Sequence, residues 1–377
     1  MVNAVKVFKK TAPNGKITVY LGRRDFVNNA TTTEPVDGVV VVDNDYLRGR
    51  KVYAAVTVTY RFGREEDEVM GLHFSKEMLL TCQEIYPSME KLKTTEVQER
   101  LLKKLGNNSY PFAIIIPDNA PCSVQLHPGS EETAKPLGVI YELKVYVADN
   151  VDEKPHRRNS VTLAVRKVQY YPLDRSNRQP STLVSKKFTM SSGTVNMEVT
   201  LDKEVYYHGE QITPSLVISN SSRKSVKGMK CAIVQHVEVT MTNAQITREV
   251  ASLESNEGCP IQSGGHFQKT FYITPLLANK SKFGIALDGK IKDTDANLAS
   301  STLLQEGSDP NDALGIVVSY SVRVRLNCGT LGGELVADLP FKLMHPAPGS
   351  GKSDSGEDLV FEDFARLRRG VSVDQHL

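Results

Sequence analysis

The stretch Lys51-Val-Tyr-Ala-Ala-Val-Thr-Val-Thr-Tyr-Arg-Phe62 alternates in polarity along its length. Val56 and Val58 fall on one side of an extended chain, whereas Thr57 and Thr59 fall on the other. A period of two residues is the period of a β-strand. The stretch therefore predicts a strand with one face buried and the other face wetter.

Similar short stretches recur along the chain, and Pro, Gly, Asn and Asp separate them. They are Ile17–Leu21, Val39–Val42, Ala113–Ile116, Val139–Val147, Val161–Val168, Val195–Leu201, Ser215–Ser219, Met229–Met241, Phe267–Thr274, Ile316–Leu326 and Leu335–Leu343. Many short strands with such turns are typical of antiparallel β-sandwiches. The predicted fold class is therefore all-β.

One segment has a helical pattern. Thr95-x-x-Gln98 matches a capping box, in which the two side chains satisfy backbone donors at a helix start. Val97, Leu101 and Leu105 then repeat every four residues and form one apolar stripe. A single amphipathic helix in a β protein is expected to cover the outer face of a sheet.

The composition bounds the class of protein. The chain has 377 residues, of which 40% are apolar and 24% are charged, and 46 basic against 44 acidic residues give a net charge of +2. These values indicate a folded chain of two or three domains rather than a disordered one. The near balance of charge argues against bulk binding of nucleic acid. No signal peptide or long apolar span is evident, so a cytoplasmic protein is expected.

Composition shifts divide the chain. We expect an N-terminal sandwich at 1–172, a polar and strand-poor hinge at 173–184, a C-terminal sandwich at 185–346, and a linker with a regulatory tail at 347–377. Leu359-Val-Phe-Glu-Asp-Phe364 is apolar again after the linker. This return of apolar residues suggests a tail that docks back on the body.

Several chemical motifs fail on inspection. Gly349-Ser-Gly-Lys-Ser353 resembles the end of a phosphate-binding loop, but Pro346 stands where the first glycine is required. The five cysteines form no CxxC pair, and the histidines show no metalloprotease spacing. We expect no catalytic residues, no metal site and no required cofactor. An enzyme is a distant alternative, since triads assemble in space rather than in sequence.

Specific blocks of sequence occur in both halves and in the tail. They include Pro13-Asn-Gly-Lys-Ile-Thr-Val-Tyr-Leu-Gly22, Gln98-Glu-Arg-Leu-Leu-Lys-Lys-Leu-Gly106, Arg166-Lys-Val-Gln-Tyr170, Leu201-Asp-Lys-Glu-Val-Tyr-Tyr-His-Gly-Glu210, Pro340-Phe-Lys-Leu-Met-His-Pro346 and Phe361-Glu-Asp-Phe-Ala-Arg366. In this order the blocks resemble those of the arrestin family. The resemblance implies two β-sandwiches, a helix packed on the first, and an inhibitory C-terminal tail. It also implies a non-enzymatic protein that binds activated, phosphorylated G-protein-coupled receptors and blocks their coupling to G protein.

The resemblance further implies a switch made of charges. Five residues correspond to the family's buried polar core: Asp25, Arg166, Asp288, Asp295 and Arg366. Buried charges are tolerated when they are paired, and removing one partner from such a pair costs about 3–5 kcal/mol. A receptor phosphate that captured Arg166 would therefore leave the acids of the second domain without their partner, and their loop would move away.

Two further groups of residues complete the implied switch. The phosphate-binding path is expected to comprise Lys9, Lys10, Arg24, Lys103, Lys104, Lys290 and Lys292. The tail latch is expected to join Phe361 and Phe364 to Val97, Leu101 and Leu105. If the tail pairs beside the first strand, phosphate on the lysines would draw a receptor segment into the place of the tail.

Gly63-Arg-Glu-Glu-Asp-Glu-Val-Met-Gly-Leu-His73 resembles the family's finger loop, which enters the cavity of an active receptor. The implied contact residues are Glu65, Asp67, Val69, Met70, Gly71 and Leu72. Met241–Glu249 resembles another receptor-edge loop of the family. The alternative interpretation of Gly63–His73 is an ordinary hairpin turn without a role in receptor binding.

Membrane and trafficking contacts are also implied. Lys227, Lys230 and Arg248 resemble a site for inositol phosphates, phosphoinositides or an anionic membrane, although Val234 replaces one basic family position. Phe361, Phe364 and Arg368 resemble the motif by which arrestins engage the beta subunit of the clathrin adaptor.

The short tail is similar to that of invertebrate visual arrestins, so the expected receptor is rhodopsin at the photoreceptor plasma membrane. The alternative function is that of an arrestin-clan scaffold that sorts cargo in endosomal trafficking without sensing phosphate. The five core charges favour the receptor-binding function.

Overall fold

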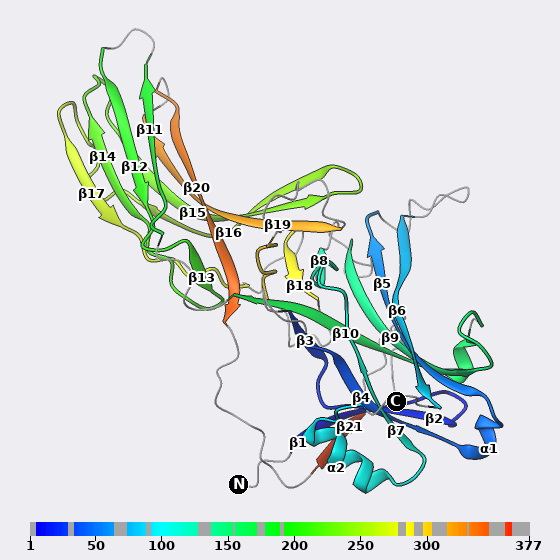
Figure 1. Ribbon diagram of the computed structural model, residues 1–377. Coiled ribbons are helices and arrows are strands. Elements are labelled where there is room, and N and C mark those ends of the chain that lie inside the picture. The colour runs from blue at the N-terminus through cyan, green and yellow to red at the C-terminus, as the bar shows by residue number, and fades with distance from the viewer. Residues whose placement is uncertain are drawn as a thin grey trace, which may run out of the picture. The chain divides into compact units, whose positions relative to one another are not determined.

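The structure is a computed structural model that describes residues 5–28, 34–63, 74–87, 92–126, 137–153, 155–171, 178–188, 192–277, 284–289, 297–303, 315–329, 332–346 and 359–363. Most of the regular structure is β-strand, as the sequence predicts (Figure 1). The chain forms two compact units. Unit 1 comprises Met1–Ser123, Glu131–Val168 and Pro348–Leu377, and unit 2 comprises Val124–Ser130 and Gln169–Ala347.

The first sheet of unit 1 has five strands and includes the tail. In spatial order they are β21 (Leu359–Asp363), β1 (Val5–Thr11), β2 (Ile17–Leu21), β4 (Val36–Val42) and β7 (Ser109–Ile114). All neighbours are antiparallel except β21 and β1, which are parallel. The tail strand therefore forms one edge of the sheet, as Figure 1 shows.

The second sheet of unit 1 carries the longest strands. They are β10 (Ser160–Tyr171), β9 (Leu137–Ala148), β5 (Lys51–Arg61) and β6 (Ser75–Tyr86), and β3 (Asp25–Asn28) pairs with β10. Strand β5 is buried on both faces, so the predicted wetter face is wrong. Tyr53 stacks on Tyr146 at 5.7 Å between ring centroids, and the two rings shield the small residues Ala55 and Ala148.

The predicted helix is present as α2 (Glu96–Leu105). Both bonds of the capping box form, since the Thr95 N–H donates to Gln98 Oε1 at 2.9 Å and the Gln98 N–H donates to Thr95 Oγ1 at 3.4 Å. The buried Gln98 amide also donates to the carbonyl oxygens of Gly38 and Phe112. One side chain thus caps the helix and fixes it to the sheet below.

A second, one-turn helix corrects the expectation of a single helix. It is α1 (Asn44–Leu47), and a 3-10 turn, η2 (Arg157–Asn159), occurs later in unit 1. Asp43 caps α1 by accepting a hydrogen bond from the Asp45 N–H at 2.9 Å. Arg48 ends it in the left-handed conformation with φ of 45°. A helix of one turn is too short to show an apolar stripe in the sequence. The capping residue Asp43 is the signal that could have predicted it.

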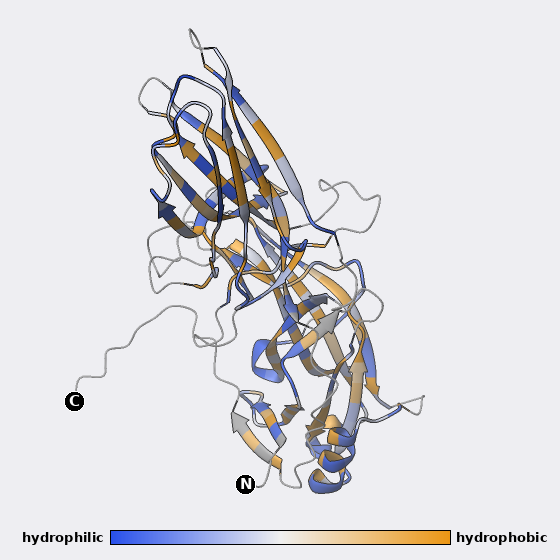
Figure 2. Ribbon diagram, turned by 90° about the vertical axis from the view of Figure 1, so that its left-hand side faces the viewer, coloured by the Kyte–Doolittle hydropathy of each residue, from blue (hydrophilic) through white to orange (hydrophobic). Residues whose placement is uncertain are grey.

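Unit 2 also contains two principal sheets. One comprises β11 (Ser181–Lys187), β12 (Thr194–Thr200), β14 (Ser215–Asn220) and β17 (His266–Thr270). The other comprises β16 (Ala244–Ser255), β15 (Gly228–Val239), β19 (Ile316–Asn327) and β20 (Glu334–Pro346). Strand β13 (Val205–Tyr207) pairs in parallel with β20, and β18 (Ala286–Asp288) pairs with β8 (Val124–Leu126). Hydrophobic and hydrophilic residues alternate along many of these strands (Figure 2).

Two expected connections turn out to contain strand. Ser181–Val184 of the expected hinge belongs to β11, a strand at the end of its sheet in which exposed and half-buried residues alternate. Residues 244–249 of the expected receptor-edge loop belong to β16, another strand at the end of a sheet. In both cases weak hydrophobic alternation concealed a strand that is buried on one side at most.

Candidate functional site

The tail pairs with the first strand of unit 1. In this register Val5 lies opposite Leu359, Val7 opposite Phe361, and Lys9 opposite Asp363. The acidic end of β21 is therefore set beside the lysine pair of β1. The tail occupies an edge of β1 that another strand could use.

Apolar contacts hold the tail differently from the predicted latch. Leu359 packs against a buried cluster of Val7, Tyr20, Val39 and Leu101, which Val97, Leu102 and Leu105 of α2 also contact. Phe361 instead lies edge-on to Tyr20, with 5.5 Å between ring centroids, and Lys104 Nζ is 4.7 Å from the Phe361 ring centroid. Leu359 thus packs half-buried against the cluster, whereas Phe361 contacts it through Tyr20 and stays 36% exposed.

The described cations of the predicted phosphate path lie on β1, on α2 or against β1. Lys9 is half-buried on β1, and Lys103 and Lys104 are exposed on the last turn of α2. The Lys10 ammonium donates a hydrogen bond to the Thr162 carbonyl oxygen. The Arg24 guanidinium lies over the Phe8 ring at 4.5 Å. Each cation therefore has a defined place near β1 or on α2, the elements that hold the tail.

Arg166 and Asp25 form a two-point ion pair inside unit 1. Arg166 Nε donates to Asp25 Oδ1 at 2.6 Å, and its Nη2 donates to Oδ2 at 2.5 Å. The backbone brings the pair together, since the Arg166 N–H donates to the Arg24 carbonyl where β3 meets β10. The guanidinium side chain is 15% exposed and the carboxylate side chain is 42% exposed. The arrangement is the fork geometry with which arginine also binds phosphate.

A buried lysine lies next to that arginine. Lys167 is 1% exposed, and its Nζ donates to the carbonyl oxygens of Pro117, Asp118 and Ala120. Burial lowers the pKa of Lys167 below its ordinary value. Without this lysine, the three carbonyl oxygens of the loop would lack their hydrogen-bond donor. The sequence alone did not single Lys167 out.

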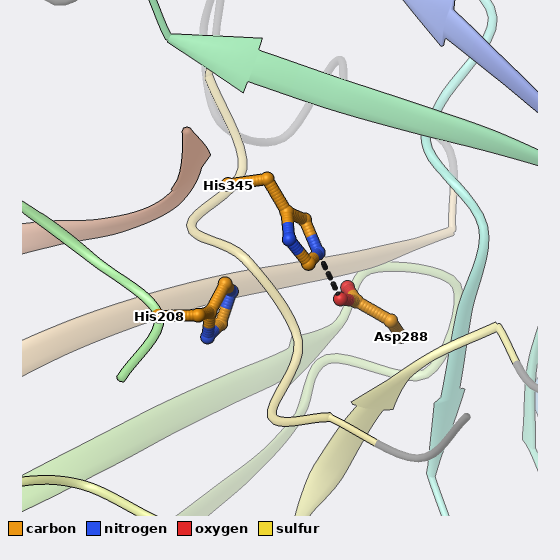
Figure 3. A group of neighbouring side chains, drawn as sticks. All are labelled: His208, Asp288 and His345. Atoms are coloured by element: carbon orange, nitrogen blue, oxygen red, sulfur yellow. Dashed lines mark hydrogen bonds and ion pairs between the residues drawn. The ribbon is translucent and has the colours of Figure 1, made fainter. Parts of the chain in front are cut away.

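Asp288 of unit 2 has partners that the sequence did not predict. It is 8% exposed, accepts a hydrogen bond from the Ser300 N–H at 3.2 Å, and lies 2.5 Å from His345 Nε2 through its Oδ2. His208 lies beside His345, with 4.4 Å between ring centroids (Figure 3). Burial, followed by the neighbouring His345, lowers the pKa of His208 to about 4.

The base of the predicted finger loop is described, although the loop itself is not. Phe62 and Phe74 meet edge-on at 6.0 Å between ring centroids, and the N–H groups of Phe62 and Gly63 both donate to the Phe74 carbonyl. A Cβ on Gly63 would lie 2.5 Å from the Phe74 side chain. Gly63 therefore permits the two segments at the base of the loop to lie close together. This role is additional to the mobility that the sequence led us to expect.

The predicted basic group of unit 2 does not form one cluster. Lys230 pairs with Glu249 at 2.8 Å, and Arg248 lies opposite Gln235, five residues further along β15. Five residues of strand span about 16 Å. Lys227 is exposed and precedes β15. The three cations thus lie before β15, on β15 and on β16, and the charge of Lys230 is partly balanced.

Several predicted site residues lie outside the described residues. They are Asp295 and Arg366 of the polar core, Lys290 and Lys292 of the phosphate path, Phe364 of the latch, Arg368 of the adaptor motif, and Glu65, Asp67, Val69, Met70, Gly71 and Leu72 of the finger loop. Their predicted roles therefore stay predictions.

Within the described part of the chain, no helix is long and apolar enough to cross a membrane.

Comparison with known proteins agrees with this arrangement over nearly the whole chain. Residues 17–171 match the family described as "Arrestin (or S-antigen), N-terminal domain", and residues 191–348 match its C-terminal domain. An arrestin homolog of Locusta migratoria is 56% identical, and the alignment covers 97% of each chain. Phosrestin-1 of Drosophila melanogaster is 51% identical over 98% of each chain. A lateral eye arrestin of Limulus polyphemus is 52% identical over 97% of this chain and 96% of its own.

The two family matches together span both units, and the relatives match at more than half of aligned positions. The predicted all-β architecture of two arrestin domains is confirmed. The chain is therefore a member of the arrestin family, a non-enzymatic regulator in receptor desensitisation.

Proposed function

We propose that this arrestin binds light-activated, phosphorylated opsin and that a phosphorylated receptor segment takes the place of β21 on β1. The observation that carries the proposal is the parallel pairing of β21 with the strand that bears Lys9 and Lys10. Adding an extended peptide to an open sheet edge is a common mode of peptide recognition. Removal of β21 would open such an edge.

Electrostatics favours the exchange when the receptor is phosphorylated. Each phosphate carries about −1.5 to −2 charges at neutral pH, which exceeds the single charge of an aspartate or glutamate. A phosphorylated segment on β1 would therefore be attracted to Lys9, Lys104 and Arg24 more strongly than the acidic tail is. The cations around β1 and α2 support this step because the tail strand lies among them.

Arg166 supplies the second step of the proposal. Its fork already binds a planar carboxylate at two points, and phosphate oxygens suit the same fork. Capture of Arg166 by phosphate would release Asp25. The acids Asp288 and Asp295, together with Arg366, are proposed to complete this switch by family resemblance. The finger loop is proposed, also by family resemblance, to enter the cavity of the active receptor and so to detect activation.

The names of the relatives point to the receptor. The Limulus polyphemus relative is named for the lateral eye, and it shares 52% of aligned residues with this chain. An opsin at the photoreceptor membrane is the receptor that this similarity favours. We propose a cytoplasmic protein that is recruited to that membrane on illumination.

Two accessory contacts extend the proposal. Release of β21 would expose Phe361, which with Phe364 and Arg368 resembles the adaptor motif, so receptor capture would be coupled to recruitment of the clathrin adaptor. Lys227, Lys230 and Arg248 are proposed to contact inositol phosphates or an anionic membrane, with no cofactor required for receptor binding. Their spread over the segment before β15, β15 itself and β16 favours an extended membrane surface over a compact soluble ligand.

Co-sedimentation with opsin membranes tests the proposal. The membranes are dark or illuminated, and phosphorylated or not, at low and high salt. Binding confined to illuminated, phosphorylated membranes and weakened by salt is the expected result. Binding to illuminated membranes irrespective of phosphate would contradict the phosphate trigger. Absence of light-dependent binding would contradict the choice of receptor and favour the cargo-sorting alternative.

A further inference from the structure

Three side chains that bind transition metals meet inside unit 2. One nitrogen of His208, one of His345 and one carboxylate oxygen of Asp288 all lie within 4.8 Å of one another. Figure 3 shows the three side chains facing each other, with His345 joined to Asp288. Among the described residues, this is the one group of three histidine, cysteine or acidic side chains that could hold a metal ion.

The fold itself brings the two histidines together. Strand β13 runs parallel to β20 with Tyr207 opposite Met344, and the His208 N–H donates to the Met344 carbonyl at 3.0 Å. The next residues along the two strands are His208 and His345. Asp288 ends β18, and the Ser300 N–H holds its carboxylate at 3.2 Å. Three separate segments thus each deliver one potential ligand.

The chemistry of the group suits zinc. Zn²⁺ takes imidazole nitrogen and carboxylate oxygen as ligands at about 2.0–2.2 Å, usually four in number. Ligand atoms of a tetrahedral ion are then about 3.3 Å apart, so donors within 4.8 Å need only modest side-chain rotation. The Ser300 hydroxyl lies 3.0 Å from His208 Nε2 and can orient that ring.

We propose that His208, Asp288 and His345 bind one Zn²⁺ ion, with water as the fourth ligand, and so join the ends of β13, β18 and β20. In the metal-free protein a hydrogen bond links His345 Nε2 to Asp288 Oδ2. Zinc takes the place of that hydrogen bond, because both atoms become metal ligands. A proton that His345 carries on Nε2 then moves to Nδ1, so the ring binds the metal as a neutral imidazole and the carboxylate keeps its charge.

Zinc at this place also bears on the switch, an extension that rests on the proposed function. Asp288 belongs by resemblance to the polar core, and a metal would fix its carboxylate to β13 and β20. Activation that requires Asp288 to move would then be slower in the zinc-loaded protein. Direct metal binding tests the site without any receptor, so failure of the proposed function leaves that test intact.

Isothermal titration of the full chain, stripped of metal with a chelator, measures the site. The variants are His208→Gln, His345→Gln and Asp288→Asn. The control is His236→Gln, since His236 is also a half-buried histidine of unit 2 bonded to a serine hydroxyl. We expect one zinc per chain, an affinity lowered more than tenfold in each of the three variants, and no such change in the control.

Two further measurements keep the proposal open to refutation if a variant fails to fold. Cobalt bound to the wild-type chain should show the strong visible absorption of a four-coordinate site, and zinc should displace it. Zinc should also protect His208 and His345, but not His236, from chemical modification mapped by mass spectrometry. Zinc binding that survives all three substitutions, protection of other histidines alone, or no stoichiometric binding at micromolar zinc would overturn the proposal.

Discussion

Arg166 pairs with a carboxylate of its own unit that is more exposed than the guanidinium itself. Its side chain is 15% exposed, whereas that of Asp25 is 42% exposed. Solvent screens the carboxylate, so this pair contributes less to the free energy of unfolding than a fully buried one. A modest contribution suits a switch, because an incoming phosphate has to compete with Asp25 for the same fork.

Arg166→Glu tests this residue. The substitution places a carboxylate beside Asp25 and is expected to lower the free energy of unfolding by about 1–3 kcal/mol. It should also raise binding to illuminated, unphosphorylated opsin at least tenfold, measured by co-sedimentation. Arg323→Glu is the control, since Arg323 forms a comparable two-point pair with Asp338 in unit 2. Equal effects of the two substitutions on phosphate preference would contradict the switch.

Lys167→Met tests the residue next to it. The variant keeps the length of the side chain but removes the donor to three carbonyl oxygens. Unsatisfied buried acceptors cost about 1–3 kcal/mol each when water cannot reach them, and a loop can relax to recover part of that. We expect a loss of about 2–4 kcal/mol in urea unfolding, with the phosphate preference unchanged. A stability equal to that of the wild type would show that water replaces the ammonium.

At the scale of elements, the tail strand is the part that must leave. Leu359→Ala removes an apolar side chain from the cluster around Leu101, and Phe361→Ala removes a ring that is 36% exposed. We expect Leu359→Ala to loosen the tail more than Phe361→Ala does, because more of its apolar contact is buried. A loss of about 1.4 kcal/mol of docking would raise the released fraction tenfold.

Distances between spin labels on the tail and on β2 measure that release, and co-sedimentation measures the accompanying gain in receptor binding. Val217→Ala is a matched control, since Val217 is 39% exposed on β14 of unit 2. The docked-tail proposal is wrong if both tail variants keep the wild-type distances while they alter binding.

A second prediction at this scale concerns the stem of the finger loop, that is, its base at Phe62, Gly63 and Phe74. Gly63→Ala would bring a Cβ within 2.5 Å of Phe74, so the stem has to open. We expect lower affinity for illuminated opsin, and little change in tail position. Gly15→Ala is a control for glycine substitution in unit 1, because no atom lies within 4 Å of an added Cβ there, although its φ of 72° adds local strain. Equal effects on opsin affinity would contradict a role of the stem.

The elements that the sequence predicted best are those with strong patterns. Strand β5, with its unbroken alternation, and helix α2, with its capping box, lie where expected. The strands at the ends of sheets, β11 and β16, were missed because a strand buried on one side at most needs few apolar residues. The second buried face of β5 depends on Tyr146, which lies ninety residues away and which no local pattern can anticipate.

The site was predicted in part by resemblance, which named Asp25, Arg166 and Asp288 individually. It could not give the pairing of Asp288 with His345, because that contact depends on the register of β13 and β20. Nor could it give Leu359 as a residue that packs against the cluster of Leu101, beside Phe361 on Tyr20. Alternation from Leu359 to Phe361 was the available signal, since both fall on one face of an extended tail.

At the scale of the whole molecule, the net charge of +2 leaves little overall field to steer an anionic partner. Any salt dependence of receptor binding must therefore arise from local groups of cations. Lys9 and Lys10 lie on the strand that the tail occupies, so they are the candidates. The Lys10 hydrogen bond to Thr162 also means that its substitution carries a structural cost of about 1 kcal/mol.

Lys9→Ala and Lys10→Ala, made singly and together, test this local origin of the salt dependence. We expect the double variant to lose most phosphate-dependent binding and to show a shallower dependence of binding on salt, because two cations no longer meet the receptor phosphates. Lys9→Ala should do so without loss of stability, which separates the charge from the Lys10 hydrogen bond. Lys187→Ala removes an exposed cation from β11 of unit 2 and should leave the salt dependence unchanged. If Lys187→Ala flattens the salt dependence as much as Lys9→Ala, the field of the whole molecule, rather than the strand beside the tail, attracts the receptor.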